Sequence, residues 1–308
     1  MKPSGSEARS PGDLWFPQPV AARGEGRLDI LDFSTYGNLI DRDSDARLES
    51  ELTALGIGVH VYPIERGPSS PPRLARRVWL RYDLRCPDDL RFIADLALRL
   101  KEEGRRVFPN ASAIIRAEDK WETYQTLRQA ALPTVDSRLA SEPAPDGGLT
   151  LLKPRVRWGG EGIRILAGPA SGAIMPGESL ADYICQPFIA HERTLTVAAA
   201  GGRAFAAIEK RRSGQDFRTD GDFGLPPRQV PVPPTAGRLA CDALAAAGLV
   251  AGTVDLIESG GRLVILEVNS APCLVYDSIP GLNLAKPMAR SVIHELEETV
   301  EDSPVRSV

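Results

Sequence analysis

An acid and an amide lie two residues apart at the end of an apolar segment near the C-terminus. Residues 261–269 read GRLVILEVN, so Glu267 and Asn269 would point to the same face of a strand. Asp255 lies in the preceding apolar segment, which the Gly-rich turn at 259–261 would fold back alongside. Oxygen donors of this kind suit Mg²⁺, which takes one or two carboxylates and completes its octahedron with waters and nucleotide phosphates. The pattern favours a magnesium site, and the alternative is that these acids are simply solvated at strand ends.

A lysine and three glycines form the second pattern. Residues 151–163 read LLKPRVRWGGEGI, which places Lys153 at the end of a strand and Gly159, Gly160 and Gly162 in the following turn. Glycines let backbone N–H groups approach phosphate oxygens, and a lysine adds a point charge. The segment is not a P-loop, and it does not open a helix as the dinucleotide fingerprint does. Taken alone, it is equally well explained as a plain Gly-rich hairpin.

Two weaker patterns lie between these. Residues 182–189 (DYICQPFI) are a short apolar run in which Pro187 interrupts pairing, which is typical of an interdomain hinge or of an edge strand. Residues 208–218 carry four basic side chains between two strands. Such a run is usually a solvated face, but in a cleft it would neutralise charge on a transferring phosphoryl group.

The composition excludes several classes of protein. The 308 residues carry a formal net charge of −4, whereas a general nucleic-acid binder needs a net basic face. With 43% hydrophobic and 25% charged residues, the chain is globular, and its length favours two or three subdomains around a cleft. The four cysteines form no CxxC pair, so we expect reduced thiols. Without a signal peptide or an apolar run of about 18 residues, we expect a cytoplasmic protein with no membrane partner.

Periodicity and turn signals place these residues on an α/β fold. Residues 1–27 are rich in Pro, Gly and Ser and are expected to form a poorly ordered arm. The expected strands lie at 28–33, 59–62, 77–82, 107–109, 149–153, 162–166, 195–200, 204–209, 252–258 and 262–268, and the expected helices at 46–55, 88–103, 119–130, 235–247 and 285–299.

Taken in order, these patterns resemble the ATP-grasp superfamily, in the branch of the RimK-type glutamate ligases and bacterial glutathione synthetases. The resemblance covers about residues 105–300 and begins with AIIRAEDK, which ends at Lys120. It implies an α+β ATP-grasp fold in which an N-terminal α/β domain, 28–109, precedes two subdomains, 110–189 and 190–308, that clasp ATP between them.

The resemblance also implies roles for individual residues. The implied nucleotide ligands are Lys120 and Lys153 at the phosphates, Gly159, Gly160 and Gly162 in a closing loop, Gln186, Pro187, Phe188 and Ile189 at the adenine, and Glu192 at the ribose. The implied metal ligands are Asp255, Glu267 and Asn269, and the implied catalytic cations are Lys210 and Arg218. The cofactors would be ATP and two Mg²⁺ ions, with Mn²⁺ as a substitute.

Four positions depart from the family pattern. Cys273 stands where a glycine is usual, Lys210 replaces an arginine, and Asp220 falls near a usual asparagine. Thr196 occupies a position where arginine is common. The first three flank the acceptor pocket, so the identity of the substrate stays open.

The activity implied by the resemblance is ATP-dependent ligation of a carboxylate to an amine, through an acyl phosphate, with release of ADP and phosphate. The partners would be a small carboxylate and an amino acid or peptide, with no nucleic acid and with homo-oligomerisation left open. The alternatives are a kinase built on the same fold and a non-catalytic ATP-binding module. Arg81, Tyr82 and Arg85, at the end of a strand, would contact an acidic substrate or form surface salt bridges.

Overall fold

The structure is a computed structural model that describes residues 14–15, 26–34, 39–66, 73–142, 148–167, 170–175, 177–214, 216–219, 224–276 and 278–298. The predicted N-terminal arm and Asp220 therefore lie outside the described residues, except for 14–15 and 26–27. Within the described part of the chain, no helix has the length and apolar character needed to cross a bilayer.

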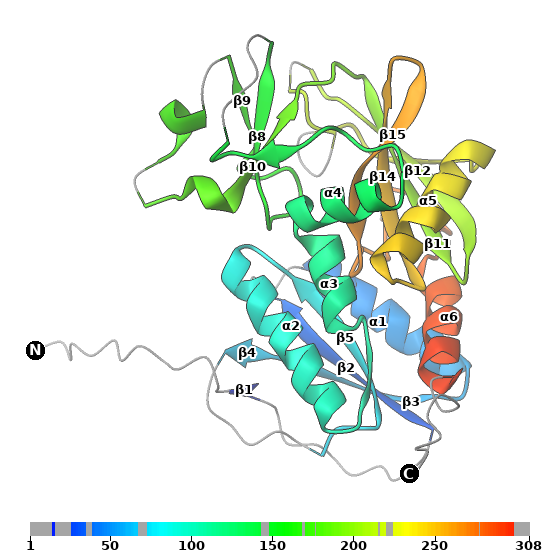
Figure 1. The fold of residues 1–308 in the computed structure, drawn as a ribbon. Helices are drawn as coiled ribbons and strands as arrows, with labels where there is room; N and C mark the ends of the chain where they lie inside the picture. The colour runs from blue at the N-terminus through cyan, green and yellow to red at the C-terminus, as the bar shows by residue number, and fades with distance from the viewer. Residues whose placement is uncertain are drawn as a thin grey trace, which may run out of the picture.

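The N-terminal sheet is parallel and covered on both faces. Its strands are β2 (Arg27–Ser34), β3 (Gly58–Pro63), β5 (Arg77–Asp83) and β6 (Arg106–Phe108), in the order β3-β2-β5-β6. Every residue of β5 is buried, as expected for a central parallel strand between two helical layers. Figure 1 shows α2 (Pro87–Glu102) crossing one face of this sheet and α1 (Leu39–Ala54) behind it.

The alternation along β2 explains the two layers. Leu28 and Ile30 join the core cluster that contains α1, whereas Leu31 and Phe33 join the cluster that contains α2. Because successive strand residues point to opposite faces, one short apolar run supplies both cores.

The helix predicted at 119–130 is present, and a helix that was not predicted precedes it. The first, α3, spans Ala111–Glu118, and the second, α4, spans Lys120–Gln129. Asp119 separates them in an extended conformation, and its carboxylate accepts from Trp121 N at 2.9 Å as the N-cap of α4. The chain therefore turns immediately before Lys120, which begins the second helix.

The second sheet is antiparallel. It contains β7 (Arg138–Leu139), β8 (Thr150–Pro154), β9 (Arg164–Leu166) and β10 (Tyr183–Pro187), in the order β7-β10-β8-β9. Since β10 has neighbours on both sides, the edge-strand alternative for this segment is wrong. Its pairing with β7 ends at Cys185, before Pro187, which has no N–H to donate.

The third sheet is also antiparallel and is covered by an alanine-rich helix. The helix is α5 (Pro234–Ala247), and the sheet order is β13-β12-β11-β14-β15, with bounds Arg228–Val230, Arg203–Arg211, Arg193–Ala200, Ala251–Ser259 and Arg262–Asn269. Gly201 and Gly202 have φ of 57° and 72°, which is the geometry that a tight hairpin between β11 and β12 requires.

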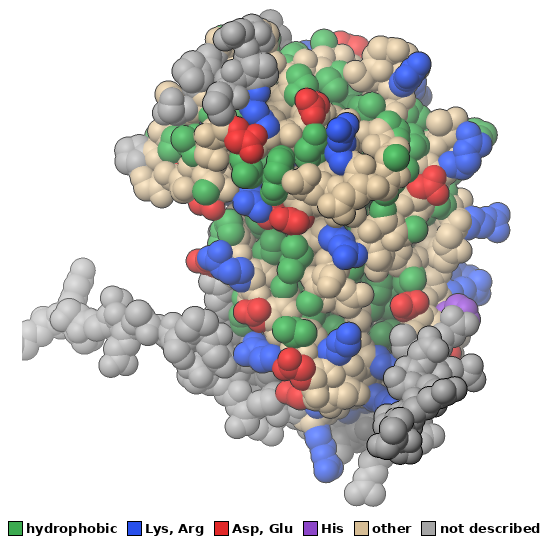
Figure 2. Space-filling view, in the orientation of Figure 1, with side chains coloured by type: hydrophobic (Ala, Val, Ile, Leu, Met, Phe, Trp, Pro, Cys, Tyr) green, Lys and Arg blue, Asp and Glu red, His purple; other side chains and the backbone are tan. Residues whose placement is uncertain are grey.

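The last helix, α6 (Ala285–Glu298), returns to the first sheet. Arg77 on β5 forms an ion pair with Glu297 at 2.8 Å, and Arg106 on β6 donates to the Glu297 carbonyl at 3.0 Å. The apolar face of α6 joins the same core cluster as α1 and α5. Figure 2 shows acidic and basic side chains interspersed over the face in view, in keeping with the small net charge.

Three arginines surround one buried carboxylate on β12. Glu209 is 1% exposed and accepts hydrogen bonds from Arg193 at 2.6 Å, Arg211 at 2.7 Å and Arg228 at 2.7 Å. Burial alone would raise the pKa of Glu209, but the three guanidinium groups lower it to about 2. Lys210 follows it on the strand and therefore points to the opposite face.

Glu209→Gln is expected to lower the free energy of unfolding at pH 7 by about 1–2 kcal/mol, an effect reduced by the solvent around the exposed arginines. A carboxylate whose folded pKa is depressed stabilises the protein above its ordinary value of 4.5, and this contribution is lost as pH falls toward 2. The free energy of unfolding, measured with urea at several pH values, should therefore differ less between variant and wild type below pH 4.5. A difference that stays constant with pH would contradict the assignment.

Candidate active site

A cavity of about 740 Å³ is lined by residues of all three larger sheets. Tyr82 at the end of β5 contributes from the first sheet, and Leu151 and Lys153 on β8 from the second. The third sheet contributes the inward-facing residues of β11, β12, β14 and β15. The cleft expected from chain length thus lies where the sheets meet.

Two carboxylates lie opposite each other on this cavity wall. Asp255 on β14 is the direct partner of Glu267 on β15, and Asn269 is paired with Thr253 two positions along. Directly opposed side chains of an antiparallel pair have Cβ atoms about 4.5–5.5 Å apart, so two opposed acids repel unless a cation lies near them. Lys210 Nζ is 4.0 Å from Asp255 Oδ1, and Lys120 Nζ is 3.8 Å from Glu267 Oε1.

The donor set fits Mg²⁺ bound together with phosphate. No cluster of three or more His, Cys, Asp and Glu side chains suited to a metal occurs in the described parts of the chain. The wall instead offers two carboxylates and one amide, which is typical of Mg²⁺ sites that leave further positions to waters and phosphate oxygens. Thr196, which stands where the family pattern has arginine, donates its hydroxyl to Asp255 Oδ1 and fixes that carboxylate from β11.

The Gly-rich loop, residues 155–163, connects β8 to β9 beside the lysines. Lys153 is buried on β8, and Lys120 Nζ donates to the Arg157 carbonyl at 2.5 Å. Gly159 and Gly160 have φ of 68° and 70°, a left-handed conformation in which other residues are strained, and both line the cavity.

Gln186 on β10 carries an oxygen that needs a donor. Ser137 Oγ donates to the Val135 carbonyl at 2.9 Å, so its oxygen accepts from Gln186 Nε2 at 2.8 Å. That hydrogen bond orients the amide and leaves Gln186 Oε1 buried without a hydrogen-bond partner. A buried acceptor of this kind is costly, and a ligand with an amino group, such as adenine, would satisfy it.

Lys210 and Arg218 also line the cavity. Asp216 accepts from Arg218 Nη2 at 2.6 Å, and this hydrogen bond lowers the pKa of Asp216 to about 2. Arg218 Nη1 also lies 3.5 Å from the Gly160 carbonyl. The arginine is thus held between Asp216, in the segment after β12, and the Gly-rich loop.

Comparisons with known proteins find one family that this chain resembles over part of its length. Residues 170–292 match the RimK-like ATP-grasp domain. A probable alpha-L-glutamate ligase of Xanthomonas campestris is 27% identical over 206 residues, which cover 62% of this chain and 70% of the relative. Over these regions the chain resembles the RimK-like ATP-grasp ligases.

Solved ATP-grasp structures have the same fold. D-cycloserine synthetase superposes with a TM-score of 0.67 at 19% identity, covering 88% of this chain and 100% of the other. D-alanine–D-alanine ligase from Bacillus anthracis, in complex with ATP, gives 0.62 at 13% identity, covering 89% and 99%. The α+β ATP-grasp fold expected from the sequence is confirmed.

Most of the predicted site residues line one cavity. They are Lys120, Lys153, Gly159, Gly160, Gln186, Pro187, Ile189, Lys210, Arg218, Asp255, Glu267 and Asn269.

Three of the predicted residues do not line it. Gly162 packs against Pro154, whose Cγ would lie 3.0 Å from a Cβ atom added at this glycine. Phe188 packs edge-on against Phe217, with the ring centroids 5.9 Å apart. The Glu192 side chain is 87% exposed and pairs with Arg212 at 3.3 Å. His191, its neighbour, lines the cavity instead.

A buried network next to Asn269 has no signal in the sequence. Glu118 accepts from Ser270 N at 3.1 Å and from Ser270 Oγ at 2.5 Å, and Tyr82 Oη lies 2.5 Å from the same hydroxyl. Burial raises the pKa of Glu118, and the hydrogen bonds from Ser270 oppose that shift. The network ties α3 and β5 to the segment that follows Asn269.

Arg81 has a structural role in the same region. It forms a buried ion pair with Asp45 at 3.0 Å and donates to the Pro272 carbonyl at 3.0 Å, and it does not line the cavity. Of the two alternatives for Arg81, the salt bridge is therefore the one observed, although it is buried and not on the surface.

Proposed function

We propose that this ATP-grasp protein is an ATP- and Mg²⁺-dependent carboxylate–amine ligase that forms an amide or peptide bond and releases ADP and phosphate. The observation that carries the proposal is the opposed pair Asp255 and Glu267, each with a lysine ammonium within 4.0 Å, on the wall of a cavity between three sheets. Relatives named as glutamate, D-alanine–D-alanine and D-cycloserine ligases or synthetases support ligation as the reaction.

The ATP would span the cavity from the hinge to the acids. Gln186 Oε1 would accept from the adenine amino group, and backbone groups of the hinge would contact the ring edge. Lys120 and Lys153 would hold the phosphates, with the loop N–H groups of Gly159 and Gly160 above them. Low exposure of Lys153, at 6%, strengthens its attraction for an anion.

Asp255, Glu267 and Asn269 would hold Mg²⁺. When bound, the metal neutralises charge on the β- and γ-phosphates. Two ions, and Mn²⁺ as a substitute, belong to this proposal. Thr196 keeps the Asp255 carboxylate in place through its hydrogen bond.

Lys210 and Arg218 would stabilise the acyl phosphate. The substrate carboxylate attacks the γ-phosphorus, forming a C–O–P linkage as the bond to ADP breaks. The amine then attacks the acyl carbon, the bond to phosphate breaks, and the amine loses a proton. Negative charge grows on the phosphoryl oxygens in both steps. Lys210 and Arg218 line the cavity and would stabilise that charge.

The substrates proposed are a small carboxylate and an amino acid or peptide, with no nucleic-acid or membrane partner. Tyr82, Cys273 and Tyr276 line the part of the cavity near the first sheet, where the acceptor would bind. A cytoplasmic location stays a prediction, in keeping with four cysteines that form no disulfide.

Release of ADP measured with paired amino acids and small carboxylates tests the proposal, with mass spectrometry of the product. A ligase turns over ATP only when both an acid and an amine are present, and it forms an amide. ADP release without an amine, with a phosphorylated product, would identify a kinase. Binding of ATP with no turnover for any pair would favour the non-catalytic module.

Gln186→Leu is expected to raise the KM for ATP by roughly 2- to 10-fold, the loss of one net hydrogen bond of about 0.5–1.5 kcal/mol. The leucine cannot accept from the adenine amino group, so the preference for ATP over ITP, which lacks that group, should shrink by a similar factor. Steady-state kinetics with both nucleotides measure it. If the ratio of the KM values for ATP and ITP did not change, the Gln186 amide would not contact the base.

A further inference from the structure

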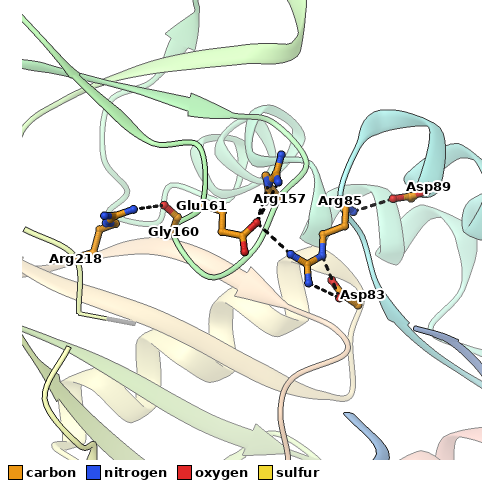
Figure 3. Close-up of polar contacts among 7 residues, drawn as sticks. All are labelled: Asp83, Arg85, Asp89, Arg157, Gly160, Glu161 and Arg218. Atoms are coloured by element: carbon orange, nitrogen blue, oxygen red, sulfur yellow. Dashed lines mark hydrogen bonds and ion pairs between the residues drawn. The ribbon is translucent and has the colours of Figure 1, made fainter. Parts of the chain in front are cut away.

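The Gly-rich loop is tied to the N-terminal sheet through one arginine (Figure 3). Arg85 lies in the turn between β5 and α2, and its Nη1 is 3.1 Å from Glu161 Oε2 in the loop. The other side of its guanidinium, Nη2, is 2.8 Å from Asp83 Oδ2, and its backbone N–H donates to Asp89 at 2.9 Å. Two acids of the first domain thus fix the position of Arg85.

The loop also has polar contacts within itself and on the side away from Arg85. Arg157 Nη2 is 3.0 Å from the same Glu161 oxygen, and the Trp158 ring centroid lies 4.8 Å from Arg85 Cζ. Across the loop, Arg218 Nη1 lies 3.5 Å from the Gly160 carbonyl (Figure 3). The turn after β5 and the segment 216–219, which lies between β12 and β13, therefore contact opposite flanks of one loop.

A loop with three glycines at positive φ has much conformational entropy to lose on ordering. Val156, 3% exposed, anchors the start of the loop in the apolar core of the first domain, whereas the three glycines that follow bring no side chain to pack. The polar contacts on its flanks then decide whether Gly159 and Gly160 stay over the cavity.

The charges around Arg85 argue against a direct role in binding an acidic substrate. Arg85 and Arg157 carry two positive charges, and Asp83 and Glu161 carry two negative ones, so this group of four is formally neutral. Its attraction for a further carboxylate is correspondingly small.

We propose that Arg85 is a positioning residue that holds the Gly-rich loop closed over the cavity through Glu161. Loop closure then depends on the first sheet, which also borders the acceptor end through Tyr82. The role in binding phosphate rests on the proposed function, but the tether itself does not. Arg85 would act on ATP only through the loop.

Limited trypsin digestion of the full-length native protein tests the tether without any turnover. Arg157 lies inside the loop, so cleavage after it reports opening. Arg85→Ala and Glu161→Gln are each expected to speed this cleavage by about fivefold, as expected for loss of a half-exposed ion pair. The double variant Arg85→Ala with Glu161→Gln should speed cleavage by less than the product of the two single effects, because both changes remove the same ion pair.

Kinetics separate a positioning role from general destabilisation. Arg85→Ala should raise the KM for ATP by about fivefold with a smaller change in kcat, and Arg85→Lys should recover part of it. The matched control is Arg91→Ala, an exposed arginine on α2 that pairs with Asp88 and does not reach the loop. It should leave cleavage, KM and Tm unchanged.

Several outcomes would overturn the proposal. Unchanged cleavage in Glu161→Gln, whose position on an exposed loop leaves the fold intact, would show that the ion pair does not hold the loop. Effects of Arg85→Ala and Glu161→Gln that multiply fully in the double variant would do the same. If cleavage responds as expected but no acid and amine pair supports ATP turnover, the tether stands and the proposed ligase activity fails.

Discussion

Glu267→Ala is expected to lower ATP turnover by about a thousandfold, because a bound metal contributes several kcal/mol of charge stabilisation and about 1.4 kcal/mol corresponds to a factor of ten. The substitution removes one of the two opposed carboxylates and leaves Lys120 without its acidic neighbour at 3.8 Å. The Glu267 side chain is 26% exposed, so its loss leaves the core packing intact. ADP release at saturating Mg²⁺ is the measurement.

Glu258→Gln is the matched control for this prediction. Glu258 lies on β14 of the same hairpin, is exposed and does not line the cavity. It should keep wild-type turnover and the wild-type Mg²⁺ requirement. ATP turnover that survives Glu267→Ala undiminished would show that the metal assignment is wrong.

Lys153→Met is expected to weaken ATP binding by roughly 10- to 150-fold, the loss of a charged hydrogen bond of about 1.5–3 kcal/mol. Methionine has a similar shape and no charge, so the buried position on β8 stays filled. The phosphates would lose one fixed cation while Lys120 remains. Calorimetric titration with a non-hydrolysable ATP analogue and Mg²⁺ measures the affinity.

The control for Lys153 is Lys101→Met, in the last turn of α2, where the side chain is exposed. ATP affinity should not change there. If Lys153→Met bound the analogue as tightly as wild type and kept its Tm, the lysine would have no role at the phosphates.

Elements that depend on local signals could be predicted from the sequence. The β11–β12 hairpin follows from Gly201 and Gly202, and the strand that ends in Glu267 and Asn269 follows from its apolar run. The strands β7 and β13 were not predicted, because two or three residues are too few to show the alternation of apolar and polar side chains. Likewise, the break between α3 and α4 depends on one capping aspartate within a helical pattern.

Contacts between distant segments could not be predicted. Ser270 meets Glu118 from 152 positions away and Tyr82 from 188, and each is an ordinary residue in its own neighbourhood. The same holds for Ser137, which orients Gln186 from 49 positions away. Only the fold brings them together, whereas the metal ligands sit on adjacent strands joined by a tight turn. The domain boundaries at 28–109, 110–189 and 190–308 stay predictions.

The return of α6 to the first sheet has a consequence for how the chain folds during synthesis. Ala285–Glu298 is synthesised long after α1, yet its residues Met288, Val292 and Leu296 share a core with Leu48 and Leu52 of α1. The N-terminal unit therefore cannot bury that face until α6 has been made. Until then a nascent chain would keep the apolar surface of α1 exposed, and chaperone binding to that stage should exceed binding to the folded protein.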